Sequence, residues 1–214
     1  MTNAKGTLVC FAAKEEARYF RKLAAHRPEI EVLLTGMGPR NAEKAIRAAL
    51  ENRRPSRVIT AGFAGGLSPD LVARTIVFQA EPALGLEAQL RAFGARQVRF
   101  HCAERVITTA AEKHAVHLST GADAVEMESQ VIHSICREHK IPVATLRVIL
   151  DTAVEDLVLD FNRLMSPDLR IDSRKLTMVL LKSPWKIPAL LRLQKLSATA
   201  AKRLGEALAR VLLE

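Results

Sequence analysis

The stretch Glu31-Val-Leu-Leu-Thr-Gly-Met-Gly-Pro-Arg40 joins a strand, a turn and the beginning of a helix. Its apolar first half predicts a buried strand, and the two glycines before Pro39 predict a turn. Pro39 suits a helix start, because the first helical turn leaves its N–H groups unpaired anyway. The alanine-rich, amphipathic residues 40–52 then predict a helix.

Short apolar runs on both sides of this unit predict two more strands. Residues 7–12 form the first run, and a charged segment after it predicts a helix that ends near Leu23. Residues 57–61 form the third strand of the series. Three strands that alternate with two helices indicate right-handed crossovers and a largely parallel sheet.

The rest of the chain gives weaker signals until its most apolar segment. Residues 143–150 are the clearest buried strand, and Asp151 follows them directly. Before this strand we expect shorter strands at 75–79, 98–102 and 122–125, and helices at 86–93, 110–118 and 128–139. After it we expect two helices, about 173–181 and 187–213.

The composition favours one α/β domain. Apolar residues make up 49% of the 214 residues but aromatics only 4%, so the core must be built from Leu, Val, Ile and Ala. We therefore predict a single domain, residues 1–169, with a mixed, largely parallel twisted sheet flanked by helices. A basic helical extension, residues 170–214, would be packed on this domain or appended to it.

Three absences bear on the compartment. The sequence has no apolar run of the ~20 residues that span a bilayer. The first six residues are polar and do not resemble a signal peptide. Cys10, Cys102 and Cys136 are odd in number and far apart, so neither a disulfide framework nor a zinc site is indicated. We expect a cytoplasmic protein without a metal site.

Most of the positive charge lies at the C-terminal end. The chain carries a net charge of +9, and residues 170–214 hold ten lysines and arginines against three acids. Together with Trp185 and the leucines, these cations suit an anionic membrane surface. The alternative is a helix that packs on the sheet with its basic side in solvent. The composition of this segment argues against nucleic acid as a partner, because Trp185 is the one stacking aromatic there.

Polar residues and glycines follow several of the predicted strands. Ligands of open parallel sheets bind beyond the carboxyl ends of the strands, so these residues are candidates for a site: Glu15, Glu16, Gly36, Gly38, Gly62, Gly65, Gly66, Glu126, Met127, Glu128 and Asp151. Each also has a purely structural interpretation. Gly36 and Gly38 could cradle an anion or form a tight turn. Glu16 could be a solvated helix residue, and Asp151 could be the N-cap of a helix.

Three segments resemble signature regions of the purine nucleoside phosphorylase and methylthioadenosine/S-adenosylhomocysteine nucleosidase superfamily. Residues 60–67, Thr-Ala-Gly-Phe-Ala-Gly-Gly-Leu, are similar to its glycine-rich T-G-S-A-G-G-L loop. Residues 122–129 contain its V-E-M-E element, and residues 146–151 are similar to its R-A-I-S-D strand end. Residues 12–16 and 35–38 match weaker elements in the same order, so the resemblance spans residues 7–152.

The resemblance implies an enzyme that cleaves the N-glycosidic bond of a purine nucleoside, with an adenine-type base as the expectation. Asp151 and Glu16 would be catalytic, Asp151 at N7 of the base and Glu16 toward water. Substrate would be bound by Glu128 at the ribose hydroxyls, by Met127 and Glu126 beside them, and by Ala64, Gly65, Phe63 and Ile107 around the base and sugar. Arg147 would pair with a carboxylate. We also expect a homo-oligomer.

The chemistry explains why carboxyl groups are needed. The bond breaks through a cation-like ribosyl transition state, and the purine leaves as an anion unless it is protonated. A carboxylic acid whose pKa is raised by burial can supply that proton. A second carboxylate can hold the sugar hydroxyls and stabilise positive charge, and a third can act as base toward water.

Departures from the family pattern leave the acceptor open. Phe63 and Leu150 replace two serines, and the positions that donate to phosphate in phosphorylases are Thr60 and Phe63 here. Gly38 and Arg40 are the best substitute for an anion site. Hydrolysis and phosphorolysis both stay open, with phosphate as a co-substrate in the second case and no other cofactor. The same departures support an alternative, a nucleoside-binding protein with impaired catalysis.

The tail carries a further resemblance. Residues 183–193, Ser-Pro-Trp-Lys-Ile-Pro-Ala-Leu-Leu-Arg-Leu, resemble the hopanoid-associated branch of the superfamily, whose substrate is a lipid-linked adenosine. This resemblance implies an alternative function, an adenosyl-lipid phosphorylase at the membrane surface. The protein would then be cytoplasmic but peripheral to the membrane.

Overall fold

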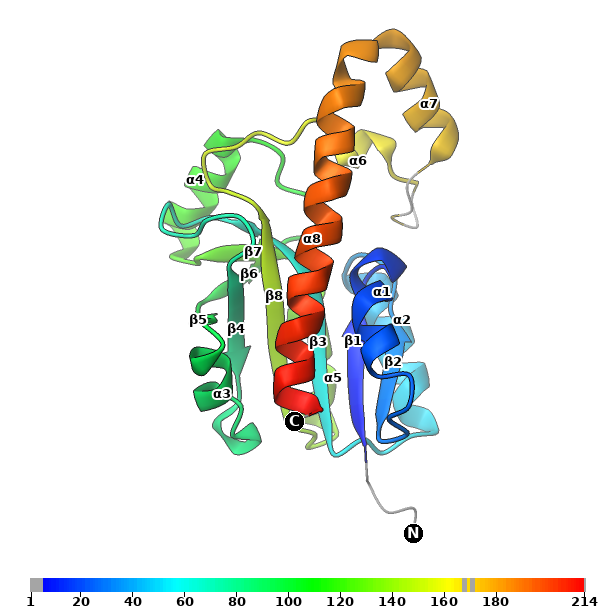
Figure 1. Cartoon of the computed structure of the whole chain (residues 1–214), viewed down its shortest axis with the longest axis vertical. Helices are drawn as coiled ribbons and strands as arrows, with labels where there is room; N and C mark the ends of the chain where they lie inside the picture. Colours follow the sequence, from blue (N-terminus) through cyan, green and yellow to red (C-terminus); the bar gives the residue numbers. More distant parts are fainter. Residues whose placement is uncertain (1–5, 167–168, 170–171, 214) are drawn as a thin grey trace.

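The computed structural model describes residues 6–166, 169 and 172–213. They form a single α/β domain with one mixed eight-stranded sheet, which confirms the predicted fold class (Figure 1). The strands are β1 (Thr7–Phe11), β2 (Ile30–Leu34), β3 (Arg57–Gly66), β4 (Ile76–Ala80), β5 (Arg96–Gln97), β6 (Phe100–Cys102), β7 (Ala124–Glu126) and β8 (Val143–Asp151). The helices are α1 (Lys14–Leu23), α2 (Pro39–Glu51), α3 (Glu87–Ala92), α4 (Ala110–Thr120), α5 (Ser129–Glu138), α6 (Phe161–Leu164), α7 (Ser173–Lys182) and α8 (Ile187–Leu212), with short 3₁₀ helices at Pro82–Leu84 and Pro184–Lys186.

Four parallel strands form the centre of the sheet. The order is β2-β1-β3-β8-β4-β5, and β2, β1, β3 and β8 are parallel to one another. On the far side of β8, β4 is antiparallel to it, and β7 pairs antiparallel with the end of β3. The predicted parallel crossovers of the first three strands are thus confirmed, and the antiparallel members make the sheet mixed.

Side chains of β1 alternate between two cores. Val9 and Phe11 pack on one face with residues of α1 and α8, whereas Leu8 and Cys10 pack on the other face with residues of α2 and α5. A strand covered on both faces needs apolar residues at every position, which is why residues 7–12 form a continuous apolar run. Burial of each large apolar side chain contributes about 1.5–3 kcal/mol.

Helix α8 runs along the whole length of the sheet (Figure 1). Its C-terminal half is buried, with Ala200, Leu204 and Leu208 among the residues that pack in the same core as β1 and β8. Gly205 lets α1 approach closely, because a Cβ atom there would lie 2.5 Å from Cδ1 of Tyr19. The N-terminal half of α8 and helix α7 extend beyond the sheet. Within the described residues, no helix is long and apolar enough to cross a membrane.

Three expectations need correction. The glycine-rich residues 62–66 are not a loop after the third strand, because β3 continues through them to Gly66. The predicted strand 98–102 is shorter, since β6 covers residues 100–102 of it, and a separate strand, β5, precedes it and pairs with a different partner. Asp151 is the last residue of β8 and not a helix N-cap, since the next helix begins at Phe161 and has Asp160 as its N-cap.

Candidate active site

A cavity of about 340 Å³ lies where β3, β7 and β8 end. Nine of the residues singled out from the sequence line it: Glu16, Phe63, Ala64, Gly65, Ile107, Glu126, Met127, Glu128 and Asp151. Phe63, Ala64, Gly65 and Asp151 come from β3 and β8, because parallel strands present their carboxyl ends at one edge of the sheet. Glu16 lies at the start of α1, just after β1, and the others lie on or after the antiparallel strand β7 and in the segment before α4. Gly38 and Arg40 are not among the lining residues, although their neighbour Met37 is.

The end of β3 brings Asp151 close to the main chain. The pairing of β3 with β8 shifts register between Ala64 and Gly65, so that Gly65 lies opposite Asp151. A Cβ atom on Gly65 would lie 3.1 Å from Cγ1 of Val125 and 3.3 Å from Oδ2 of Asp151. Glycine at this position therefore allows β3, β7 and the carboxyl group of Asp151 to lie close together beside the cavity.

Glu126 is paired on both of its oxygens. Its Oε2 accepts from Nη2 of Arg147 at 2.6 Å and from the amides of Glu128 and Ser129, and its Oε1 accepts from the Ser129 hydroxyl at 2.7 Å. Burial alone would raise its pKa, but the Arg147 charge and these hydrogen bonds hold the pKa below its ordinary value. The predicted pairing of Arg147 with a carboxylate is confirmed, and Thr60 accepts a second bond from Arg147 at 2.9 Å.

Glu128 lies two residues further on and is less completely paired. Its Oε1 accepts from the Gly38 amide at 2.7 Å, and its Oε2 lies 3.8 Å from Nη2 of Arg147. Burial and the neighbouring charge of Glu126 raise its pKa to about 7, against the lowering effect of Arg147 and the Gly38 amide. Glu128 can therefore change its protonation state near neutral pH and accept hydrogen bonds from a ligand.

Glu16 is held against the main chain of β3. Its Oε1 accepts from the amide of Phe63 at 2.8 Å, and its Oε2 accepts from the amide of Ala13 at 3.0 Å. A Cβ atom on Gly62 would lie 2.7 Å from Oε1, so the glycine makes room for this carboxyl group. Burial raises the pKa of Glu16 more than these hydrogen bonds and the Arg147 charge lower it. The bond to Ala13 also caps the first turn of α1, so Glu16 has a structural role as well.

Asp151 lies at the end of β8 beside a lysine that our sequence analysis missed. Its side chain is 18% exposed, and its Oδ2 lies 2.5 Å from Nζ of the fully buried Lys113. Burial raises the pKa of Asp151 more than the Lys113 charge lowers it. The sequence did carry a signal for the burial of Lys113. In the predicted helix 110–118, Lys113 and Val116 are three positions apart and so lie on the same face, and Val116 is partly buried. A lysine on such a face needs an acidic or carbonyl partner.

The predicted anion site is not assembled at the cavity. The Gly38 amide donates to Glu128, and the side chain of Arg40 is exposed on α2. Arg105 is the one positively charged residue among the described residues that line the cavity. Its guanidinium is exposed and donates a hydrogen bond to Glu112 at 2.7 Å. No group of three or more His, Cys, Asp or Glu side chains within the described residues could hold a metal ion.

The apolar wall of the cavity comes from segments that the sequence did not link to it. Phe161 and Met165 lie on and just after α6, and Leu193 lies in the N-terminal half of α8. Leu150 and Phe63, which replace two family serines, line the same cavity. No local signal marks these residues as neighbours, since their contact depends on how the tail crosses the sheet edge.

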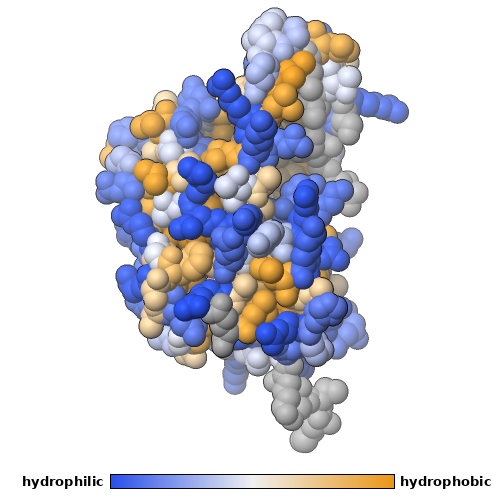
Figure 2. Space-filling model, viewed as in Figure 1, coloured by the Kyte–Doolittle hydropathy of each residue, from blue (hydrophilic) through white to orange (hydrophobic). Residues whose placement is uncertain are grey.

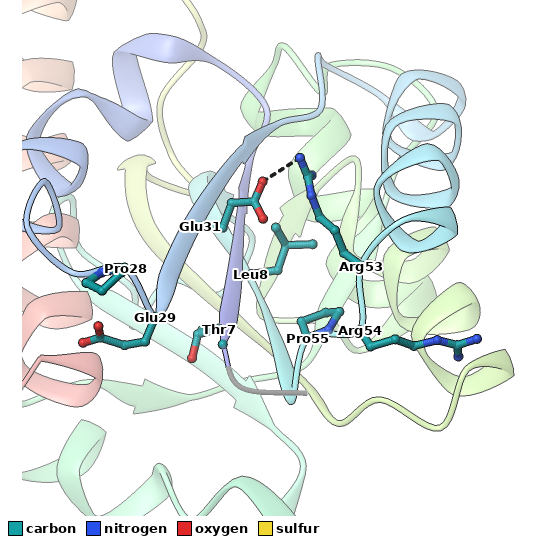
Figure 3. A pocket seen from close by; sticks show the side chains of 9 residues that line it. Thr7, Leu8, Pro28, Glu29, Glu31, Arg53, Arg54 and Pro55 are labelled. Atoms are coloured by element: carbon teal, nitrogen blue, oxygen red, sulfur yellow. Dashed lines mark ion pairs between the residues drawn. The ribbon is translucent and has the colours of Figure 1, made fainter. Parts of the chain in front are cut away.

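A second cavity, of about 250 Å³, lies at the opposite end of the sheet (Figure 3). It is lined by the amino ends of β1 and β2 and by residues 53–55. Arg53 points toward Glu31 and forms an ion pair at 2.8 Å, whereas Arg54 points away from the cavity. Both partners of the ion pair are about half exposed, whereas the carboxyl groups of the first cavity are largely buried.

Comparison with known proteins agrees with the fold and the motifs. The family model described as "Phosphorylase superfamily" matches residues 78–171. The 5′-methylthioadenosine/S-adenosylhomocysteine nucleosidase of Anoxybacillus flavithermus is 26% identical over 207 residues, which cover 72% of this chain and 88% of the relative.

Solved structures with the same fold cover almost the whole chain. The futalosine hydrolase of Helicobacter pylori has a TM-score of 0.71 at 14% identity, covering 98% of this chain and 97% of its own. The 5′-methylthioadenosine/S-adenosylhomocysteine nucleosidase of Campylobacter jejuni also has a TM-score of 0.71 at 14% identity, with coverages of 97% and 98%. The chain is therefore similar in sequence to the phosphorylase superfamily over residues 78–171, and it shares the fold of these nucleosidases over almost its whole length.

Proposed function

We propose that this protein is a nucleosidase that cleaves the N-glycosidic bond of a purine nucleoside with water. The observation that carries the proposal is the convergence of Glu16, Glu128 and Asp151 on one largely apolar cavity at the carboxyl ends of the strands. A glycosyl-bond-cleaving enzyme needs three such groups, which protonate the base, hold the sugar and activate the acceptor. The similarity to the nucleosidase relative supports the same reaction class.

Asp151 is the proposed general acid. Its carboxyl group is largely buried at the end of β8, and its pKa is raised by that burial. A carboxyl group with a raised pKa keeps its proton to a higher pH, and it can transfer that proton to N7 of the purine as the C–N bond breaks. The base then leaves as a neutral molecule.

Glu128 and Met127 are the proposed sugar-binding residues. The Glu128 carboxyl, with a pKa of about 7, can be ionised near neutral pH and accept hydrogen bonds from two sugar hydroxyls. In that state its negative charge also stabilises the cation-like ribosyl group. Glu126 is a supporting residue in this proposal, because both of its oxygens are already paired.

Water is the proposed acceptor, with Glu16 as its base. The Gly38 amide is paired with Glu128, Arg40 is exposed, and the cation of the described lining, Arg105, is exposed and paired. Among the described residues that line the cavity, phosphate would therefore meet four carboxyl groups and no buried cation, and this charge opposes its binding. Glu16, whose pKa is raised by burial, can accept the proton of an attacking water.

The test is base release from a nucleoside panel, for example adenosine, inosine and 5′-methylthioadenosine, with and without phosphate. We expect free purine at the same rate in both buffers. Release that depends on phosphate would overturn hydrolysis, and Arg40→Ala would then show whether Arg40 binds phosphate. Tight nucleoside binding without any release would favour the alternative of a binding protein with impaired catalysis.

We also propose that the projecting end of the molecule binds an anionic membrane surface. Residues 173–205 contain eight lysines and arginines and no acid. Five of the ten exposed large apolar side chains in the described part of the chain lie here: Met178, Leu181, Trp185, Ile187 and Leu191. Helix α7 and the N-terminal half of α8 extend beyond the sheet, and hydrophobic and hydrophilic residues lie side by side on this end (Figures 1 and 2).

Apolar side chains among cations favour the interface of an anionic bilayer. The test uses Leu181→Ser and Trp185→Ser together, because both side chains are more than 70% exposed and their loss leaves the core intact. The intact protein should sediment with anionic vesicles at low salt and not with neutral ones, and the double variant should sediment several-fold less. Equal sedimentation of both proteins, or none of the intact protein, would contradict the proposal.

A further inference from the structure

Lys113 is a buried cation that the proposed reaction does not yet use. It lies on α4, and its side chain is 0% exposed. Its ammonium group has three N–H donors and three oxygen neighbours: Oδ2 of Asp151 at 2.5 Å, the Thr152 carbonyl at 2.7 Å and the Glu155 carbonyl at 2.7 Å. The ammonium is thus fully paired and has one fixed position.

Burial of an ammonium group is costly, and an apolar residue would fill the same space without that cost. Two of the three acceptors are main-chain carbonyls of the segment that follows β8. This segment is itself fixed, because Glu155 accepts from the amide and hydroxyl of Thr152, each at 2.8 Å. Lys113 therefore links α4 to a rigid turn, and its third bond fixes the carboxyl group of Asp151, which lines the cavity.

We propose that Lys113 is a positioning residue for Asp151, holding Oδ2 so that Oδ1 is the oxygen that carries the proton to the purine. This inference rests on the proposed function. In the step, the Oδ1–H bond breaks and the base nitrogen gains the proton, while the electrons of the C–N bond pass to the base. Water supplies hydroxide to the sugar carbon and a proton to Glu16, and exchange with solvent then restores both carboxyl groups.

The charge of Lys113 assists this transfer because it is in place before the reaction. As the proton leaves, negative charge develops on Asp151 beside the ammonium group and is stabilised without any reorganisation. Four other charged groups near Asp151 are acidic: Glu155 and the cavity-lining residues Glu16, Glu126 and Glu128. The cavity is also lined by the cation Arg105, but its side chain is exposed. Without Lys113, the Asp151 carboxylate would lack a buried cationic partner among the described residues.

The test is Lys113→Met, which keeps an unbranched side chain but removes the charge. Loss of orientation should lower kcat roughly 10²-fold while KM for the nucleoside changes little. The pKa of Asp151, followed by ¹³C NMR of its carboxyl group, should rise, because burial persists without the cation. His114→Met, on the exposed side of the same helix, is the control and should alter neither quantity.

The outcomes separate the two proposals. A folded Lys113→Met variant with wild-type kcat, or with an unchanged Asp151 pKa, would overturn the role of Lys113 alone. No base release by the wild-type protein from any nucleoside would overturn the proposed function, and the role in proton transfer with it. If Lys113→Met does not fold, Lys113→Gln takes its place, since its amide can still donate to the main-chain carbonyls without a charge.

Discussion

The two ends of the central sheet differ in how they hold their ion pairs. At the carboxyl end, Arg147 and Glu126 lie 2.6 Å apart with side chains only 2% and 1% exposed. At the amino end, Arg53 and Glu31 lie 2.8 Å apart but are 44% and 47% exposed (Figure 3). The distances are similar, so burial is what distinguishes the two pairs. Charges are removed from water at the end where the proposed chemistry needs them, and they stay hydrated at the other end.

This difference has an energetic consequence. An exposed pair is screened by water and salt and contributes about 0–1 kcal/mol. A buried pair costs desolvation energy to form, and removal of one partner leaves an uncompensated buried charge. The carboxyl end should therefore respond strongly to substitution and to pH, and the amino end should respond weakly.

The largest effect on stability is expected for Arg147→Met. This variant leaves Glu126 buried without its cation and should lower the free energy of unfolding at pH 7 by about 3–5 kcal/mol. Urea denaturation followed by circular dichroism measures the change. A loss below about 1 kcal/mol would mean that the buried pair behaves like an exposed one, and the contrast between the two ends would fail.

Asp151→Asn tests the carboxyl end through catalysis. Asparagine keeps the shape of the side chain but cannot transfer the proton, so kcat should fall by roughly 10²–10⁴. Circular dichroism should show a folded protein, which separates this effect from instability. Wild-type turnover in a folded Asp151→Asn variant would remove Asp151 from the chemistry.

Glu128 should make stability depend on pH. Its pKa rises from an ordinary 4.5 to about 7 in the folded protein, so the folded state binds the proton more tightly. The stability it contributes is fully present below pH 4.5 and is lost as pH rises through 7, by at most about 3 kcal/mol. Glu128→Gln should flatten this part of the profile.

The difference between the wild-type and Glu128→Gln profiles isolates this group. Both proteins keep His133, and burial lowers the pKa of this histidine from 6.5 to about 4 in the folded protein. The stability that its neutral form contributes is therefore lost in both proteins as pH falls below 6.5. Denaturation midpoints measured from pH 4 to 8 would provide the comparison. Parallel profiles for the two proteins would contradict the assignment of the pH dependence to Glu128.

The smallest effect is expected for Arg53→Met at the amino end. Removal of one partner of an exposed pair should change the free energy of unfolding by less than about 1 kcal/mol, and nucleoside cleavage should be unaffected. The same urea titration as for Arg147→Met gives a matched measurement, since both variants replace arginine by methionine. A loss comparable to that of Arg147→Met would show that burial does not govern the difference.

The tail illustrates the limit of a local pattern. The sequence predicted two helices, about 173–181 and 187–213, and α7 and α8 are observed there. The cations left two alternatives open, a membrane surface and a helix packed on the sheet, and Ala200, Leu204 and Leu208 are buried on the sheet. An amphipathic helix has the same periodicity whether its apolar face meets a sheet or a membrane, so the pattern alone could not identify the partner.

The sequence by itself determined the early strands and helices and the positions of the acidic residues at the strand ends. These features are local, because strand and helix periodicities and turn residues act over a few positions. Only the tertiary structure decided the partner of each charge: Arg147 for Glu126, the Gly38 amide for Glu128 and Lys113 for Asp151. Those partners are 21, 90 and 38 positions apart in the chain. Burial and charge pairing depend on which distant segments pack together, and no local pattern encodes that.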